Sequence, residues 1–496
     1  MTAYNTLETI FRRWNALGNA SSMLHWDNAT MMPSGSGDVR GEQLMVLAEL
    51  SHEIITQPML GDVFAKAESE LASLDDWQQA NMREMKRLWR HATAVPVELV
   101  SALTKACHES ELFWRMARPE NNFKDFIPYQ TKVLELVRES AGAKASSLGL
   151  SPYDALLDQY DPGTQSITID AIFDDLTGFL PDFIKAVIER QASQKPPVEV
   201  GETIPVSAQK ALGIEFMQKV GFDFARGRLD ESVHPFCGGV PGDIRLTARY
   251  NEQDFLSGFF AVMHETGHAL YERGLPASYA RQPVGEAAGM AVHESQSLIM
   301  EMQACRGDAY LGWLGTQMHA AFGGAPADYA CANLARLWRR VDRSLIRVDA
   351  DEMTYPAHVI LRFQLEQALI AGDLVVADLP GAWNDGLHDL LGVRPANDRE
   401  GCLQDIHWYD GAFGYFPSYT LGAMAAAQLM QVARVAEPTI GDALAEGSLA
   451  PLLGWLRRHV HAQGSLMGFE ALLTQATGGP LDPAAFEQHL ASRYLP

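Results

Sequence analysis

Apolar residues recur at every third or fourth position along the first 200 residues, and this spacing constrains the fold most strongly. The pattern is clear in residues 6–27 and 39–60, and it is typical of amphipathic helices. Pro96 and Pro119 mark the ends of two more helical stretches, because proline interrupts helical hydrogen bonding. Residues 151–168, rich in proline and glycine, are expected to form a loop between helices.

Strand signals are few, and the best are residues 228–236 and 243–250. In the second of these, polar and apolar residues alternate, as in a half-exposed strand. The alternating residues are Arg245, Thr247 and Arg249 against Ile244, Leu246 and Ala248. Helical patterns return from Glu252 onward. The sequence therefore predicts a mainly α protein with a small β-sheet beside its motif-bearing helix.

Residues 194–205 form the most linker-like stretch of the chain. They separate a helical N-terminal part, about residues 1–200, from a part that holds the motifs, about residues 201–496. A chain of 496 residues has room for two or three domains, although an all-helical enzyme of this size can form one body around a cleft.

The charge and the cysteines limit the class of protein. The net charge is −23, from 39 basic and 62 acidic residues, so we expect neither nucleic acid nor anionic lipid as a partner. The five cysteines are scattered and form no CxxC pair, which indicates a reduced, cytoplasmic chain. The N-terminus has no apolar signal region, and no run is long enough to span a membrane.

Residues 263–276, MHETGHALYERGLP, contain the motif HExxH. A helix from Asp254 to Arg273 is predicted, with Gly274 as its C-terminal cap and Pro276 beyond it. On this helix His264 and His268 lie about 40° apart around the axis, one turn separated. Both can direct a nitrogen at one ion, while Glu265 beside them can take a proton from an attacking water. The alternative is a pair of surface or hydrogen-bonded core histidines, and the helical context favours the metal.

A catalytic zinc ion needs a third protein ligand. Residues 284–303 read as a helix that offers Glu286, Glu294 and His293. The two glutamates would lie about 80° apart around its axis, so spacing alone does not choose between them. Each could instead be a surface charge or a partner of a ligand histidine. A third histidine close after HExxH is absent, which excludes the metzincin pattern.

Eight segments, in order along nearly the whole chain, resemble the carboxypeptidase Taq family of metallocarboxypeptidases. They are LHWDNATMMP from Leu24, SPYDALLDQYDPG from Ser151, HPF at His234, DIRLT at Asp243, HExxH at His264, HESQ at His293, IRVDAD at Ile346 and GCLQDIHW at Gly401. The resemblance implies Glu294 as the third ligand and one Zn²⁺ per chain. Co²⁺ often substitutes in sites of this type. The resemblance also implies a single catalytic domain over residues 1–496, a helical saddle with a deep groove, and a homodimer. The implied substrates are peptides with a free C-terminus, which lose single residues with broad preference but poorly at proline.

The family's reaction suggests roles for further residues. Glu265 would act as the general base, and the developing oxyanion would need a donor besides the metal. Tyr419 is the favoured donor, with Tyr415 next and His407 as a further contact. Each could instead be an aromatic residue packed in a glycine-rich loop.

Substrate recognition requires a group that binds the free α-carboxylate. Arginine does this well through its planar fork, and the resemblance points to Arg347. On sequence alone, a salt bridge to Asp349 or Asp351 is the more natural reading. Asp243 and Arg245 are expected to shape the substrate site or brace the metal helix, with Thr247 capping that arrangement, and His234 is expected to line the groove or support a ligand. A buried ion pair in a strand would look the same.

Three other functions compete with this one. The first is an oligopeptidase or endopeptidase with the same metal core, which HExxH does not distinguish. The second is a peptide-binding protein that has lost catalysis, against which the intact Glu265 argues. The third is a structural zinc protein, which fits poorly because structural sites favour four ligands rich in cysteine.

Overall fold

The computed structural model describes residues 2–200 and 203–495, which divide into two compact units. Each unit is built from three separate stretches of chain. The first comprises Met1–Ala92, Pro196–Trp338 and Ala425–Leu481, and the second comprises Thr93–Lys195, Arg339–Met424 and Asp482–Pro496. One boundary therefore falls inside the predicted linker, of which residues 201 and 202 lie outside the described part. The single catalytic domain stays a prediction.

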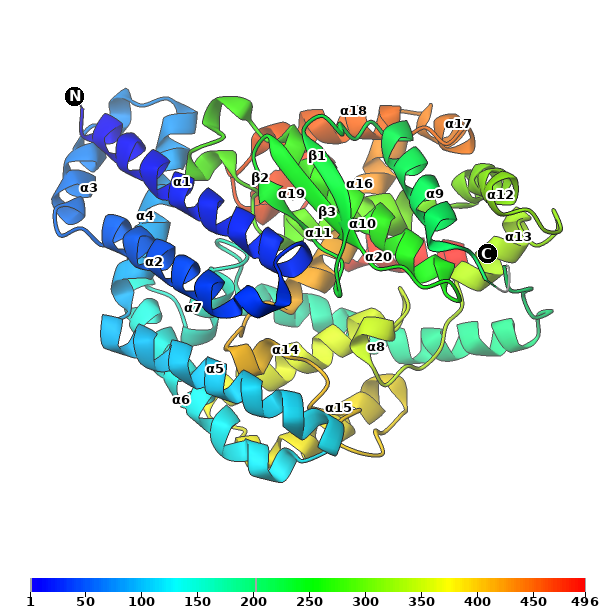
Figure 1. Cartoon of the computed structure of the whole chain (residues 1–496), viewed down its shortest axis with the longest axis horizontal. Helices are drawn as coiled ribbons and strands as arrows, with labels where there is room; N and C mark the ends of the chain where they lie inside the picture. The colour runs from blue at the N-terminus through cyan, green and yellow to red at the C-terminus, as the bar shows by residue number, and fades with distance from the viewer. Residues whose placement is uncertain (1, 201–202, 496) are drawn as a thin grey trace. The chain divides into compact units, whose positions relative to one another are not determined.

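Helices make up most of both units, as the spacing of apolar residues predicted (Figure 1). The first unit contains α1 Ala3–Thr30, α2 Gly37–Ile55, α3 Leu60–Ser69, most of α4 Asp76–Ala94, α9 Val206–Lys219, α10 Phe255–Gly274, α11 Met290–Leu298, α12 Asp308–Phe322, α13 Cys331–Trp338, α17 Ile440–Ala445, α18 Ala450–His459 and α19 Phe469–Thr477. The second contains α5 Val97–Glu120, α6 Phe123–Leu148, α7 Pro152–Leu157, α8 Ser166–Ala192, α14 Tyr355–Ala371, α15 Leu379–Leu391 and α20 Pro483–Tyr494. Helix α16, Pro417–Ala436, belongs to the second unit at its start and to the first thereafter.

A three-stranded sheet lies in the first unit, with β3 against α10 (Figure 1). The strands are β1 Gly227–Glu231, β2 Cys237–Val240 and β3 Asp243–Ala248, in the order β1-β3-β2. Strand β3 pairs parallel to β1 and antiparallel to β2. The predicted small sheet beside the motif helix is confirmed, whereas β2 carried no clear strand signal.

The alternation predicted over residues 244–249 holds at five of the six. Ile244, Leu246 and Ala248 are buried, Arg245 is partly exposed, and Arg249, just beyond β3, is exposed. Thr247 is the exception, since it is completely buried. Its hydroxyl accepts a hydrogen bond from the Phe236 N–H at 3.0 Å, which provides the partner that a buried polar group requires.

Two local predictions were wrong. The segment expected to be a loop contains α7, because Ser151 caps the helix by accepting from the Asp154 N–H and Pro152 occupies the first turn, where proline is favoured. Gly274 does not cap α10 but is its last helical residue. It has another reason to be glycine, since a Cβ there would lie 2.4 Å from Nδ1 of His461.

The continuous helix expected over residues 284–303 is broken in the structure. Pro283–Gly285 forms a short 3₁₀ turn, Glu286 is extended, and Gly289 has a φ of 111°. Helix α11 begins only at Met290 and continues into a π-helical turn, Ile299–Cys305. Glu286 and Glu294 are therefore not on one helix. Glu286 is exposed and accepts a hydrogen bond from Nδ2 of Asn15 at 3.0 Å.

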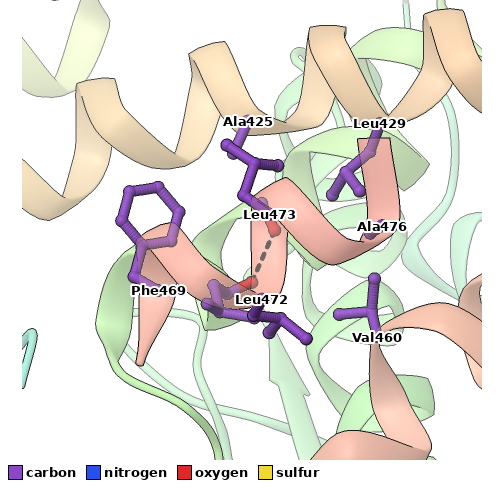
Figure 2. A pocket seen from close by; sticks show the side chains of 9 residues that line it. Ala425, Leu429, Val460, Phe469, Leu472, Leu473 and Ala476 are labelled. Carbon is purple, nitrogen blue, oxygen red and sulfur yellow. Dashed lines mark hydrogen bonds between the residues drawn. The ribbon is translucent and has the colours of Figure 1, made fainter. Parts of the chain in front are cut away.

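Apolar side chains pack closely against α11. Side chains of α16 and α19 surround a void of about 10 Å³, which Figure 2 shows from close by. A void of this size is at the limit for one water and lacks the polar partners that a water needs. Its lining consists of Val292, Ser295, Ala425, Leu429, Val460, Phe469, Leu472, Leu473 and Ala476.

No helix among the described residues is both long enough and apolar enough to cross a bilayer.

Candidate metal centre

Two neighbouring helices of the first unit bring together the three predicted metal ligands. Helix α10 carries His264 and His268, and α11 carries Glu294. One ligand atom from each residue lies within 4.8 Å of the others. Oε2 of Glu294 is 3.4 Å from Nε2 of His268 and 3.7 Å from Nε2 of His264. Two imidazoles and one carboxylate facing a common point suit a divalent ion with an open coordination position.

The crossing of the two helices depends on Gly267, inside the HExxH motif. A Cβ on this residue would lie 2.6 Å from the carbonyl oxygen of Gln296 and 2.7 Å from Cα of Ser297. Both atoms belong to the backbone of α11, so the helices touch without an intervening side chain. This close approach brings Glu294, two residues before Gln296, toward the two histidines.

A carboxylate outside the predicted set supports His264. Nδ1 of His264 lies 3.0 Å from Oε2 of Glu301, which sits in the π-helical turn after α11. Nη2 of Arg306 donates to the other oxygen of Glu301 at 2.6 Å. Metal-binding histidines commonly engage a carboxylate through their second nitrogen. The sequence analysis missed Glu301. The one hint was that this glutamate lies a few residues after HESQ, in the same helical stretch.

The electrostatics of the cluster favour added positive charge. Burial alone would lower the pKa of His264, but the carboxylates of Glu294 and Glu301 outweigh it and raise that pKa to about 10. Burial alone would raise the pKa of Glu294, but the neighbouring His264 and His268 lower it to about 2. The carboxylates thus stabilise a positive charge at this position. A bound divalent cation can supply that charge in place of a protonated imidazole.

Glu265 lies among these groups but differs from them. Only 7% of the residue is exposed, and burial raises its pKa to about 7, against the opposing effect of His264. A carboxyl group with this pKa can both accept and release a proton near neutral pH. Its position next to His264 on α10 is the one predicted.

The predicted residues of the sheet contact one another. Arg245 donates to both oxygens of Asp243, at 2.9 and 2.6 Å, and its guanidinium lies 4.5 Å from the ring centre of Trp26. This ion pair holds the pKa of Asp243 below its ordinary value. The side chain of His234 is exposed. Thr247 fastens the neighbouring HPF segment to β3, because its backbone N–H donates to the Phe236 carbonyl at 3.0 Å.

The remaining candidates lie in the second unit, where Arg347 is nearly buried, with 6% exposed. Its Nε and Nη2 donate to Oδ1 of Asp405 at 3.1 and 2.7 Å, and its Nη1 donates to the Tyr355 hydroxyl at 2.7 Å. Asp405 also accepts from Nε of the fully buried Arg362, at 2.7 Å. The salt-bridge partner is thus Asp405 of the GCLQDIHW segment, and not Asp349 or Asp351 as the sequence suggested.

The three predicted oxyanion donors lie close together near Arg347. The ring of Tyr419 packs edge-on against Tyr415 at 5.2 Å, and its centre is 5.4 Å from the Arg347 guanidinium carbon. The ring of His407 lies 5.9 Å from that of Tyr415. Burial lowers the pKa of His407 to about 4, so this imidazole is neutral at physiological pH.

The chain matches a known protein family over nearly its whole length. The family model described as carboxypeptidase Taq (M32) metallopeptidase matches residues 6–494. The chain belongs to the carboxypeptidase Taq family. It is therefore a metallocarboxypeptidase, a hydrolase that acts on peptides with the help of a divalent metal.

Individual members of the carboxypeptidase Taq family match over the full length. Thermostable carboxypeptidase 1 of Thermus thermophilus is 35% identical, over 99% of this chain and 98% of that protein. The solved structure of Trypanosoma cruzi metallocarboxypeptidase 1 is 38% identical, with a TM-score of 0.97 and 99% of both chains covered. An M32 carboxypeptidase structure from Deinococcus radiodurans is 31% identical, with a TM-score of 0.93 over 99% and 98% of the two chains. The family predicted from the sequence motifs is confirmed.

Proposed function

We propose that this metallocarboxypeptidase removes single C-terminal residues from peptides with broad preference, using Zn²⁺ held by His264, His268 and Glu294. The observation that carries the proposal is the convergence of Nε2 of both histidines on Oε2 of Glu294, at 3.7 and 3.4 Å, with Glu265 buried beside them. Mixed nitrogen and oxygen donors in this number suit zinc, and Co²⁺ can substitute in such a site. When bound, the ion polarises the scissile carbonyl and acidifies water.

Glu265 is the proposed general base. Its carboxylate accepts a proton from the attacking water and later delivers it to the leaving amine. The pKa of about 7 supports both steps, because proton transfer in each direction is then possible near neutral pH. Its neighbours His264 and Glu294 stay in place through their own contacts, so Glu265 remains available for the proton.

Arg347 is the proposed binding group for the substrate's α-carboxylate. Its contacts with Asp405 and Tyr355 use three of the five N–H donors of a guanidinium. Two N–H groups remain after the described contacts, one on each terminal nitrogen. Asp405 holds the plane of the guanidinium, and Arg362 shares the charge of Asp405, so Arg347 keeps positive charge for an anionic ligand.

The oxyanion donor is proposed to be Tyr419, with Tyr415 next and His407 as a further contact. A hydroxyl that donates to the developing negative charge stabilises the transition state more than the ground state. Packing of Tyr419 against both Tyr415 and Tyr355 restricts its ring, which supports a fixed donor. Asp243, Arg245 and His234 are proposed as weaker contributors to the peptide-binding surface.

A mass-spectrometric time course tests the proposed reaction. The Zn²⁺-loaded and Co²⁺-loaded enzymes are incubated with one mixed-sequence peptide, prepared with a free or an amidated C-terminus. A ladder of single-residue losses from the free acid alone is the expected result. Internal cuts in both peptides would instead establish an oligopeptidase or endopeptidase, and no cleavage with metal bound would favour a peptide-binding protein.

Two further proposals concern the state of the protein in the cell. A homodimer is proposed from the family resemblance, and light scattering of the purified protein tests it. A cytoplasmic location is proposed because all five cysteines are free thiols, of which Cys107, Cys305 and Cys402 are buried. Fractionation of the producing cells tests the location.

A further inference from the structure

The two ligand histidines are supported in different ways. His264 directs its Nδ1 at the carboxylate of Glu301, at 3.0 Å. His268 directs its Nδ1 at another imidazole, since Nδ1 of His293 is 2.7 Å away. On its other side, Nε2 of His293 lies 2.8 Å from Oε1 of Glu272. A chain of three side chains therefore runs from the metal cluster to Glu272.

Only one arrangement of protons satisfies all of these contacts together with metal binding. Nε2 of His268 faces Glu294 and must be unprotonated to bind an ion, which places the proton of His268 on Nδ1. That N–H can donate only if Nδ1 of His293 is unprotonated. His293 then carries its proton on Nε2 and donates it to Glu272, whose carboxylate can only accept.

The three residues are fixed to one another by the helices that carry them. His268 and Glu272 are four residues apart on α10, so they lie on the same face. His293 belongs to α11 and bridges the two, with its ring 4.5 Å from that of His268 and 5.4 Å from that of Tyr271. The side chains of His293 and Glu272 are 15% and 30% exposed, so this series of side-chain contacts leads from the interior toward the surface.

We propose that His293 and Glu272 are positioning residues, which hold His268 in the tautomer and orientation that bind the metal ion and thereby determine how tightly the ion is retained. Within the HESQ segment, His293 therefore supports a ligand residue, whereas its neighbour Glu294 is itself a proposed ligand. The inference rests on the metal site of the proposed function. Partners of this kind typically change metal affinity by roughly 10- to 100-fold when they are removed.

The test measures Zn²⁺ affinity directly, by competition with a chromophoric chelator, for the full-length protein. Glu272→Ala removes the final acceptor, and we expect the dissociation constant for Zn²⁺ to rise by roughly 10-fold or more. Arg273→Ala is the matched control, because Arg273 follows Glu272 on α10 and pairs with Asp223 at 2.8 Å instead. We expect its Zn²⁺ affinity to equal that of the wild type.

A double-mutant cycle tests whether His293 and Glu272 act as one unit. His293→Ala should weaken Zn²⁺ binding at least as much as Glu272→Ala, and combining the two should add little, because the contact is already lost. Thermal unfolding of the metal-free variants should match that of the metal-free wild type. A purely structural role would instead lower the unfolding temperature of the metal-free variants.

The possible results distinguish a failure of the positioning role from a failure of the proposed metal site. Wild-type Zn²⁺ affinity in Glu272→Ala, equal weakening in Arg273→Ala, or fully additive effects in the double variant would each overturn the positioning role alone. Failure of the wild-type protein to bind Zn²⁺ would overturn the proposed metal site as well. Hydrolysis need not be measured to separate these cases.

Discussion

Replacing Gly267 with alanine should displace one metal ligand without touching it. The new Cβ would lie 2.6 Å from the Gln296 carbonyl oxygen and 2.7 Å from Cα of Ser297. Restoring an ordinary contact of 3.4 Å from 2.6 Å requires a shift of about 0.8 Å. Because both atoms are backbone atoms, α11 itself must move, and Glu294 moves with it.

Two magnitudes follow from this shift. Overpacking of a core typically costs about 1–3 kcal/mol, which corresponds to a decrease in unfolding temperature of roughly 2–6 °C. A misplacement approaching 1 Å in an active site can reduce activity by roughly 100-fold. We therefore expect Gly267→Ala to lower kcat/KM far more than its modest loss of stability would suggest, and to weaken Zn²⁺ binding.

Gly312→Ala provides the matched control. Gly312 lies in α12 of the same unit, and a Cβ there meets no atom within 4 Å. Alanine favours a helix over glycine by about 1 kcal/mol, so this variant should be slightly more stable and fully active. The assays are thermal unfolding of the metal-free proteins, Zn²⁺ competition and peptide hydrolysis. A Gly267→Ala enzyme with wild-type activity and stability would refute the reasoning about the helix crossing.

Three other predictions test separate parts of the molecule. Glu265→Gln should retain Zn²⁺ but lose turnover by roughly 10²- to 10⁴-fold, measured by metal content and peptide hydrolysis; retention of most activity would refute the general base. Arg347→Ala should reduce kcat/KM roughly 10- to 100-fold for free-acid peptides, because a charge-assisted hydrogen bond contributes about 1.5–3 kcal/mol, and should affect amidated peptides little; an equal effect on both would indicate a structural salt bridge. His461 has its pKa lowered to about 3 by burial, so the unfolded chain binds more protons below about pH 6.5 and stability falls as pH decreases from there. His461→Gln should flatten this decrease in unfolding temperature between pH 7 and 5, and an unchanged slope would contradict the assignment.

The helix of the HExxH motif was predictable because its information is local. Asp254 caps α10 by accepting from the Ser257 N–H at 3.2 Å, as expected of an acidic residue in that position. The spacing of His264 and His268 then determines that both lie on one face. Family resemblance, and not spacing, identified Glu294 as the third member of the cluster.

Contacts between distant segments could not be predicted in the same way. The sequence placed Glu286 and Glu294 on one helix because apolar residues continue at helical spacing past Gly289, and an isolated glycine inside such a pattern is tolerated. In the structure Gly289 has a φ of 111° and precedes a new helix. The expected partners of Arg347 were its neighbours in sequence, whereas Asp405 lies 58 residues away. Local periodicity contains no information on which distant carboxylate meets a given arginine, since that depends on how the helices pack.

The contact of His264 with Glu301 escaped prediction for a different reason. Glu301 lies in a π-helical turn, and such turns are rare but frequent at functional sites. A wider turn changes which face of the helix a residue occupies, so periodicity based on 3.6 residues per turn no longer applies there. No residue type in Ile299–Cys305 predicts this change of helix type.

The metal cluster and its supporting residues all fall within one short stretch of chain, from His264 to Arg306. An ion bound there would close only loops within this stretch, and the entropy lost on closing a loop grows slowly with its length. The first unit, by contrast, joins three distant segments through contacts such as Asn15 with Glu286 and Arg83 with Ser465. Binding of a metal ion would therefore constrain this stretch alone, whereas the contacts that join the three segments of the unit close much longer loops.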